Sequence, residues 1–89
     1  MSYKKIHAVY RKYFDLDFWP CEVCGLPAVD VHHIVYRSQG GQNTVENGIA
    51  LCRRCHRRAH FQEKPYLTKD YLECVHKKYI DITKSKNYN

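Results

Sequence analysis

Residues 21–60 read CEVCGLPAVDVHHIVYRSQGGQNTVENGIALCRRCHRRAH, and this segment holds most of the chain's cysteines and histidines. A Cys-x-x-Cys pair stands at each end, formed by Cys21 and Cys24 and by Cys52 and Cys55. Two such pairs can bring four thiolates to the corners of a tetrahedron, the usual geometry of a structural zinc site. We therefore predict that these four cysteines bind one Zn²⁺ ion that stabilises the segment.

A second pattern consists of histidines. His32 and His33 are adjacent in an expected strand, where neighbouring side chains point to opposite faces, so we expect them to have different roles. His56 and His60 are four residues apart in an expected helix and would share one face. Together with His32 they could form a three-nitrogen metal site with open coordination positions. The spacing alone leaves open the alternative that they are surface or core histidines without a metal.

The pattern of apolar and polar residues predicts the secondary structure of this segment. Short Val- and Ile-rich runs at 28–34 and 48–51 predict two strands, separated by the polar, glycine-containing loop 37–44. A helix should then run from residue 52 or 53 to about 62, before Pro65 stops it. The predicted core is therefore strand, loop, strand, helix.

Amphipathic helices are predicted on both sides of this core. The first has apolar residues at three- and four-residue steps, namely Tyr3, Ile6, Val9, Tyr10, Tyr13 and Phe14. Thr68 could cap the last helix, which would bury Tyr71, Leu72, Val75 and Tyr79 against the first. Cys74 is expected to be a buried core thiol of that helix, and residues 81–89 are expected to fray.

The length and composition limit the class of protein. A chain of 89 residues fits a single domain, 1–89, and its net charge of +6 favours a polyanionic partner such as nucleic acid. An odd number of cysteines and the absence of an apolar signal run argue against a secreted disulfide framework. No segment has the ~18 consecutive apolar residues that a membrane span requires. We expect a cytoplasmic (intracellular) protein that does not enter membranes.

Several short motifs combine within residues 21–61, which are a little under half of the chain. They are VHHI at 31–34, the glycine pair at 40–41, NGIAL at 47–51 and C-x-x-C-H-x-x-x-H at 52–60. Together they resemble the HNH endonuclease motif of the ββα-metal nucleases, in its zinc-knuckle form. The resemblance implies a small α+β fold: a ββα-metal, treble-clef-like core with a structural zinc bound by the four cysteines, and with flanking N- and C-terminal helices.

The resemblance also implies a reaction and a role for each motif residue. The reaction is hydrolysis of DNA phosphodiester bonds with a catalytic divalent ion (Mg²⁺, Mn²⁺, Ni²⁺ or Zn²⁺) that stabilises the leaving group. His33 would be the general base and Asn47 would brace the loop that aims it. His32 and His56 would bind the catalytic ion, and His60 matches a further ligand that some members use. Asp30 would orient one of these ligands.

Five arginines lie near the motif residues, and they are expected to contact DNA phosphates: Arg37, Arg53, Arg54, Arg57 and Arg58. A solvated helix face is the alternative for each of them. Two other functions remain open, namely a non-catalytic zinc-stabilised nucleic-acid-binding module and a protein-interaction domain whose tyrosine-rich outer helices bind a partner. The complete histidine set favours the nuclease. Specificity for a long DNA site would require a homodimer or a partner protein.

Overall fold

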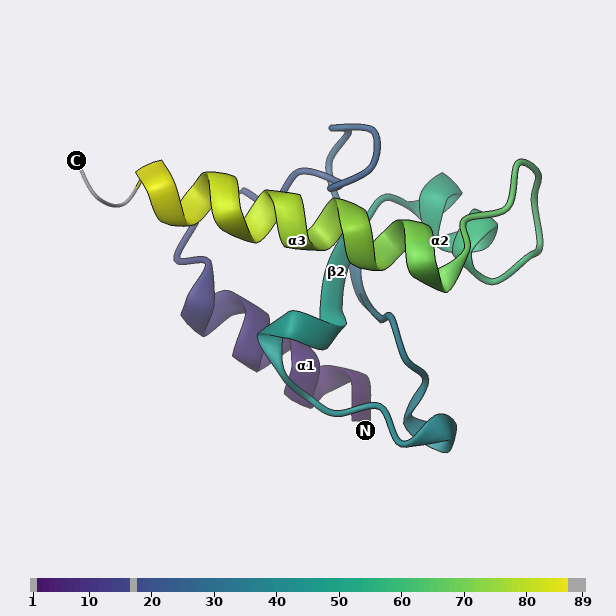
Figure 1. Cartoon of the computed structure of the whole chain (residues 1–89), viewed down its shortest axis with the longest axis horizontal. Coiled ribbons are helices and arrows are strands. Elements are labelled where there is room, and N and C mark those ends of the chain that lie inside the picture. Colours follow the sequence, from purple (N-terminus) through teal and green to yellow (C-terminus); the bar gives the residue numbers. More distant parts are fainter. Residues whose placement is uncertain (1, 17, 87–89) are drawn as a thin grey trace.

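The computed structural model describes residues 2–16 and 18–86, and it describes the side chains of residues 5–16 and 18–83. Helices lie at both ends of the chain, with a small sheet and a short helix between them (Figure 1). In chain order the elements are α1 (Ser2–Tyr13), β1 (Asp30–His33), the short 3₁₀ helices η1 (Arg37–Gln39) and η2 (Val45–Asn47), β2 (Gly48–Leu51), α2 (Arg53–Ala59) and α3 (Lys69–Lys86). This is the small α+β arrangement expected for a ββα-metal core with flanking helices.

The two strands pair in antiparallel fashion, with Val31 opposite Ala50 and His32 opposite Ile49. The second strand has the predicted bounds. The first is shorter than the predicted 28–34 because β2 offers only four residues for pairing. Since side chains alternate along a strand, Val31 and Ala50 pack toward α1, whereas Ile49 packs toward α2 and α3. The sheet therefore separates two apolar clusters.

The first helix covers one face of the sheet with side chains four residues apart. Ile6, Tyr10 and Phe14 have exposed fractions of 0%, 0% and 4%, which confirms the predicted amphipathic helix. The helix approaches β2 closely because that strand begins with Gly48. A Cβ added to Gly48 would lie 2.9 Å from Ile6 and 3.0 Å from Val31.

One residue of this helix differs from the prediction, and another cannot be compared. Tyr13 is 44% exposed rather than buried, and its ring packs edge-on against Phe14 with centroids 4.8 Å apart. Tyr13 precedes Phe14 by one residue, which places it about 100° around the helix, at the border of the buried stripe. The side chain of Tyr3 lies outside the described residues.

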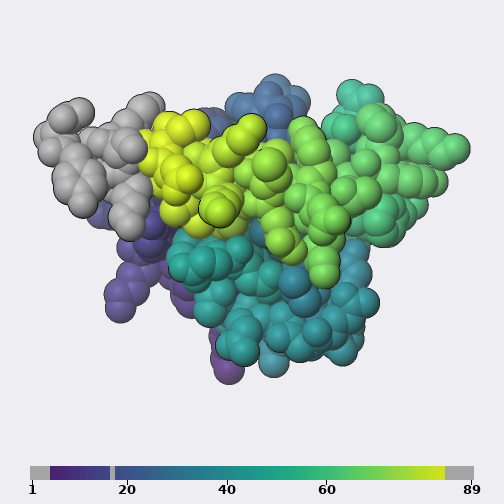
Figure 2. Space-filling model, viewed as in Figure 1, coloured from purple at the N-terminus to yellow at the C-terminus, as the bar shows by residue number. Residues whose placement is uncertain are grey.

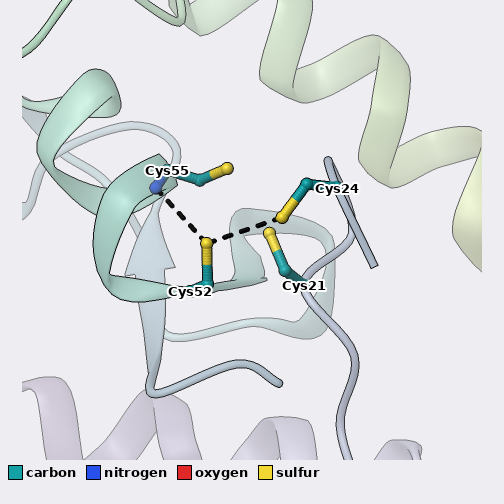
Figure 3. A group of neighbouring side chains, drawn as sticks. All are labelled: Cys21, Cys24, Cys52 and Cys55. Atoms are coloured by element: carbon teal, nitrogen blue, oxygen red, sulfur yellow. Dashed lines mark hydrogen bonds between the residues drawn. The ribbon is translucent and has the colours of Figure 1, made fainter. Parts of the chain in front are cut away.

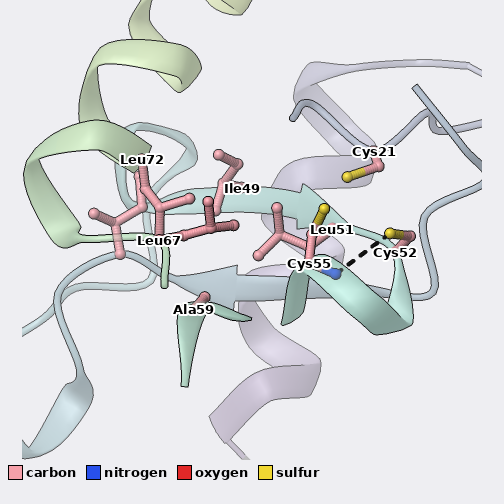
Figure 4. Close-up of a cluster of buried hydrophobic side chains, with 9 residues drawn as sticks. Cys21, Ile49, Leu51, Cys52, Cys55, Ala59, Leu67 and Leu72 are labelled. Atoms are coloured by element: carbon pink, nitrogen blue, oxygen red, sulfur yellow. Dashed lines mark hydrogen bonds between the residues drawn. The ribbon is translucent and has the colours of Figure 1, made fainter. Parts of the chain in front are cut away.

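The opposite face of the sheet packs against α2 and the start of α3 (Figure 4). The buried residues of this cluster are Cys21, Ile34, Ile49, Leu51, Cys52, Cys55, Ala59, Leu67 and Leu72. Three of the four cysteines predicted to bind zinc belong to it. A chain of this size buries only a limited apolar core. A metal bound by these cysteines would therefore lie within the core and stabilise it.

The short helix α2 ends at Ala59 and not near residue 62 as predicted. Phe61 has a φ of 60°, in the left-handed region that commonly terminates helices. The His60 N–H still donates to the His56 carbonyl oxygen at 3.1 Å. His56, on the last turn of α2, and His60, which caps its end, therefore lie on the same side of the helix.

The last helix is capped as predicted, since Thr68 Oγ1 accepts a hydrogen bond from the Tyr71 N–H at 3.2 Å. It continues to Lys86, so the expected fraying is wrong for residues 81–86, and residues 87–89 lie outside the described part. The ring of Tyr79 contacts that of Phe14, with centroids 5.3 Å apart, which confirms the predicted packing of the last helix on the first. Figure 2 shows α3 (green to yellow) running across the upper part of the molecule in this view.

Two side chains of α3 lie on a different face from the one predicted. Leu72 and His76 are 1% exposed and define the buried side of the helix. Cys74 lies midway between them in sequence, roughly opposite on the helical wheel, so it is exposed and the expected core thiol is wrong. Tyr71 is 48% exposed, at the edge of the stripe. Within the described residues, no helix combines the length and apolarity needed to cross a membrane.

A buried ion pair joins α3 to the first cysteine pair, and nothing in the sequence pattern predicted it. His76 Nδ1 lies 2.7 Å from Glu22 Oε1, and the two side chains are 1% and 0% exposed. Glu22 Oε2 also accepts hydrogen bonds from the Tyr10 hydroxyl at 2.7 Å and from the Ala50 N–H at 3.1 Å. His76 Nε2 contacts the Val45 carbonyl oxygen. Both ring nitrogens of His76 face acceptors, an arrangement that favours the protonated ring.

Candidate active site

The four cysteines predicted to bind zinc come together from two parts of the chain (Figure 3). Cys21 and Cys24 lie in the loop before β1, and Cys52 and Cys55 lie at the start of α2. Their Sγ atoms are all within 4.8 Å of one another, and those of Cys24 and Cys52 are 3.5 Å apart. Thiolates bound to one zinc ion at about 2.3 Å lie about 3.8 Å apart. The spacing and the donor type therefore fit a tetrahedral zinc site.

Backbone groups shape this sulfur cluster. Gly25 has a φ of 85°, which allows the tight turn in which its N–H donates to the Cys21 carbonyl oxygen at 2.9 Å. The Cys55 N–H points at Cys52 Sγ at 3.5 Å. Burial opposes ionisation of Cys52, but this N–H and the neighbouring sulfurs outweigh it and lower its pKa to about 7. Cys52 is therefore poised to become a thiolate, the form that binds metals.

The three histidines predicted to share an ion also converge. His32 comes from β1, His56 from the last turn of α2, and His60 from the position that caps this helix. Each offers a ring nitrogen within 4.8 Å of the others. His56 Nε2 and His60 Nε2 are 3.1 Å apart. Nitrogens bound to one ion at 2.0–2.1 Å lie roughly 2.9–3.4 Å apart, so the cluster fits a divalent ion.

The protonation of these imidazoles is suited to metal binding. Burial lowers the pKa of His32 to about 3, assisted by the nearby His56, His60 and His33 and opposed by Asp30. The pKa of His56 is also lowered, mainly by burial and in addition by the nearby His60, whereas the charge of Asp30 acts to raise it. His32 is therefore neutral at physiological pH and can donate a lone pair to a cation.

The two helical histidines each have a partner for the ring nitrogen that faces away from the cluster. His56 Nδ1 lies 3.8 Å from Asp30 Oδ2. His60 Nδ1 lies 3.4 Å from the Tyr36 hydroxyl, and the two rings stack at an interplanar angle of 19°. A hydrogen-bond partner on one ring nitrogen sets which nitrogen of a histidine is presented to a metal, and the Asp30 contact is about 1 Å too long for such a bond. In the structure the two Nε2 atoms face each other.

A hollow of about 350 Å³ opens beside the three imidazoles. It is lined by Asp30, Val31, His32, His33, Tyr36, Arg37, His56 and His60. A larger hollow of about 880 Å³ lies between α3 and the 40–47 loop and contains none of the metal-binding candidates. The smaller hollow is the candidate active site, because it is lined by the three clustered imidazoles and by a fourth, that of His33.

Hydrogen bonds hold His33 and the loop that follows it. His33 Nε2 lies 2.8 Å from Asn43 Oδ1. Asn47 is 9% exposed and its amide reaches across the loop. Its Oδ1 accepts from the Val35 N–H at 2.7 Å, and its Nδ2 donates to the carbonyl oxygens of Val35 and Gln42 at 3.0 and 2.9 Å.

The arginines near the site differ in their surroundings. Arg37 lines the hollow and is exposed, as is Arg53. Glu63 pairs with both Arg54 and Arg57, at 2.9 and 3.0 Å. Arg58 is half-buried, and its guanidinium donates to the Pro65 carbonyl oxygen at 2.7 Å and reaches Cys55 Sγ at 3.9 Å. Arg58 thus braces the end of α2, and Arg37 and Arg53 are the more accessible cations.

Three side chains at this site escaped the sequence analysis: Asn43, Tyr36 and His7. Asn43 and Tyr36 lie in the loop between the strands, where a polar residue or a tyrosine carries no distinctive signal. His7 belongs to α1 and meets Asp30, 23 residues further along the chain. Only the packing of α1 on the sheet brings it there.

Comparison with known proteins agrees with this geometry. Residues 21–62 match the family model of the HNH endonuclease. The chain is 32% identical over 74 residues to the type IV methyl-directed restriction enzyme EcoKMcrA of Escherichia coli K12, an alignment that covers 72% of this chain and 24% of that protein. It is 41% identical over 44 residues to the uncharacterized protein YdfU of the same organism, covering 46% of this chain and 13% of YdfU.

The chain thus spans a quarter or less of the length of these two relatives. No solved structure gives a significant match. The matched family segment contains the four cysteines, the three clustered histidines, His33 and Asn47, whereas α1 and α3 lie outside it.

Proposed function

Because residues 21–62 belong to the HNH endonuclease family, we propose that this chain is a metal-dependent DNA endonuclease that hydrolyses phosphodiester bonds. The observation that carries the proposal is the convergence of His32, His56 and His60 beside His33 in one open hollow. A purely structural or DNA-binding zinc module has no need of this set.

His32, His56 and His60 would hold the catalytic divalent ion in this proposal. Their nitrogens are close enough to share it, and the low pKa of His32 keeps that ring unprotonated. When bound, the ion supplies Lewis-acid stabilisation of the charge that develops on the phosphate and on the leaving 3′ oxygen. Asp30 would orient His56 through Nδ1.

His33 would be the general base that accepts a proton from the attacking water. Asn43 Oδ1 can only accept a hydrogen bond, so in this proposal the His33 nitrogen that it faces, Nε2, would carry the hydrogen. Nδ1 is then left with a lone pair, as a base requires. Asn47 would brace the loop behind His33 through its three hydrogen bonds to residues 35 and 42.

The four cysteines would bind a structural zinc ion, which we propose is separate from the catalytic ion. The support is the closed, partly buried sulfur cluster with no histidine among its members. Arg37, which lines the hollow, and the exposed Arg53 would contact DNA phosphates. Binding through such contacts would weaken as salt is raised.

The deciding experiment is nicking of supercoiled plasmid by the purified chain with Mg²⁺, Mn²⁺ or Ni²⁺. We expect cleavage by the wild type and a loss of about 10²–10⁴-fold in His33→Ala, with an unchanged melting curve. Cys74→Ala is the matched control, since this exposed residue on α3 lies away from the histidines.

Two outcomes would contradict the proposal. If wild type and His33→Ala bind DNA equally and are inert with every metal, the chain is a zinc-stabilised binding module. If a chelator that spares the cysteine-bound zinc leaves cleavage intact, the roles proposed for His32 and His56 are wrong.

A further inference from the structure

A side chain from outside the matched segment reaches the proposed metal site. His7, in α1, places its Nε2 within hydrogen-bond distance of Asp30 Oδ1, and the Val31 N–H donates to the same oxygen at 2.9 Å. The other oxygen, Asp30 Oδ2, is the atom that faces His56 Nδ1 at 3.8 Å. The carboxylate of Asp30 therefore stands between a residue of α1 and a proposed metal ligand.

This arrangement restricts the rotation of the carboxylate. Oδ1 contacts both His7 Nε2 and the Val31 N–H, and this N–H also lies 3.2 Å from His7 Nε2. The three groups together hold Oδ1 and thereby restrict where Oδ2 can lie. A shift of the His56 ring by about 1 Å would bring Nδ1 to hydrogen-bond distance of Oδ2. His56 Nε2 lies 3.1 Å from His60 Nε2 in the structure, so Nδ1 is the ring nitrogen on the side of Asp30.

The packing of α1 against the sheet holds His7 in a defined position. The neighbouring Ile6 and the next turn's Tyr10 are both fully buried against the sheet. The His7 side chain is 34% exposed, and its ring lies 6.2 Å from that of Trp19. It is therefore a ring held between an aromatic neighbour and a carboxylate, not a surface side chain in open solvent.

We propose that His7 is a positioning residue of the metal site, acting through Asp30 on the orientation of His56. This inference rests on the proposed function, because it requires an ion at His32, His56 and His60. It extends the site beyond the family motif: residues 21–62 alone would lack the partner that fixes Asp30, and α1 would be part of the catalytic unit as well as of the core.

The test is calorimetric titration of Ni²⁺ into the full chain with zinc already bound at the cysteines. His7→Ala should raise the Kd for Ni²⁺ about tenfold. His7→Gln, whose amide N–H can still reach Asp30 Oδ1, should stay within about threefold of the wild type. Lys5→Ala is the control, an exposed residue of the same helix, and should leave the Kd unchanged.

A double-mutant cycle separates positioning from general stability. In the Asp30→Asn background, His7→Ala should change the Kd by less than about twofold, because its effect passes through the carboxylate. An equal loss in both backgrounds, or the same Kd in His7→Ala and the wild type, would overturn the inference and leave the proposed nuclease standing. If Ni²⁺ binding does not depend on His56, as judged from His56→Ala, the proposed metal site itself fails.

Discussion

Replacing His76 by leucine should destabilise the fold more than its place on a peripheral helix suggests. His76 and Glu22 are almost completely buried, and Glu22 retains two hydrogen bonds, from Tyr10 and Ala50, when the imidazole is removed. His76→Leu keeps an apolar side chain of similar size but leaves the carboxylate without a counter-charge. The Val45 carbonyl oxygen loses its donor as well.

The expected cost is about 3–5 kcal/mol, the usual loss when one member of a buried ion pair is removed. A domain of this size has a total stability of roughly 5–15 kcal/mol, so the variant would be near its folding limit. If the unpaired charge is the cause, Glu22→Gln in the His76→Leu background should recover more than about 1 kcal/mol.

Urea unfolding at a fixed excess of Zn²⁺ measures these differences, because the fixed zinc concentration keeps the metal contribution constant. Trp19 is the single tryptophan and lies 4.8 Å from Tyr10, so its fluorescence reports on this part of the core. A loss of less than about 1 kcal/mol in His76→Leu would refute the reasoning. So would a double variant that is less stable than His76→Leu alone.

The same pair predicts a pH dependence. Burial alone would lower the pKa of His76, but the hydrogen bond and charge of Glu22 and the Val45 carbonyl oxygen raise it above its ordinary value. The ion pair therefore contributes fully below the unfolded pKa of about 6.5 and is lost as the pH rises through the raised value. The stability difference between wild type and His76→Leu should be largest near pH 6 and shrink above it, and a difference that grows with pH would contradict the assignment.

Three further predictions concern the core and the loop. Gly41→Ala should cost roughly 2–3 kcal/mol in urea unfolding, because the new Cβ would lie 1.7 Å from the Val35 carbonyl oxygen; an unchanged midpoint would contradict this. Asn47→Ala should cost about 2–3 kcal/mol and abolish nicking, because two carbonyl groups and one N–H lose their partner; full activity would rule out the bracing role. Cys52→Ser should show no cooperative melting by circular dichroism, whereas His33→Ala should melt like the wild type; matching curves for Cys52→Ser and His33→Ala would contradict the separation of the two metal sites.

The local features of residues 21–60 followed from the sequence because they depend on short spacings. The two Cys-x-x-Cys pairs and the four-residue spacing of His56 and His60 act within one turn of chain, and the structure brings each set together. The second strand, the cap at Thr68 and the amphipathic first helix were predictable for the same reason. The roles of the site residues remain predictions.

Tertiary structure decided where the pieces meet. The periodicity of α3 could not show that Cys74 faces solvent while His76 enters the core, because that depends on which side of the helix meets the sheet. The contacts of His7 with Asp30 and of His76 with Glu22 join residues 23 and 54 positions apart. Sequence spacing carries information about neighbours along a helix or strand, whereas these contacts arise only when α1 and α3 close over the two faces of the sheet.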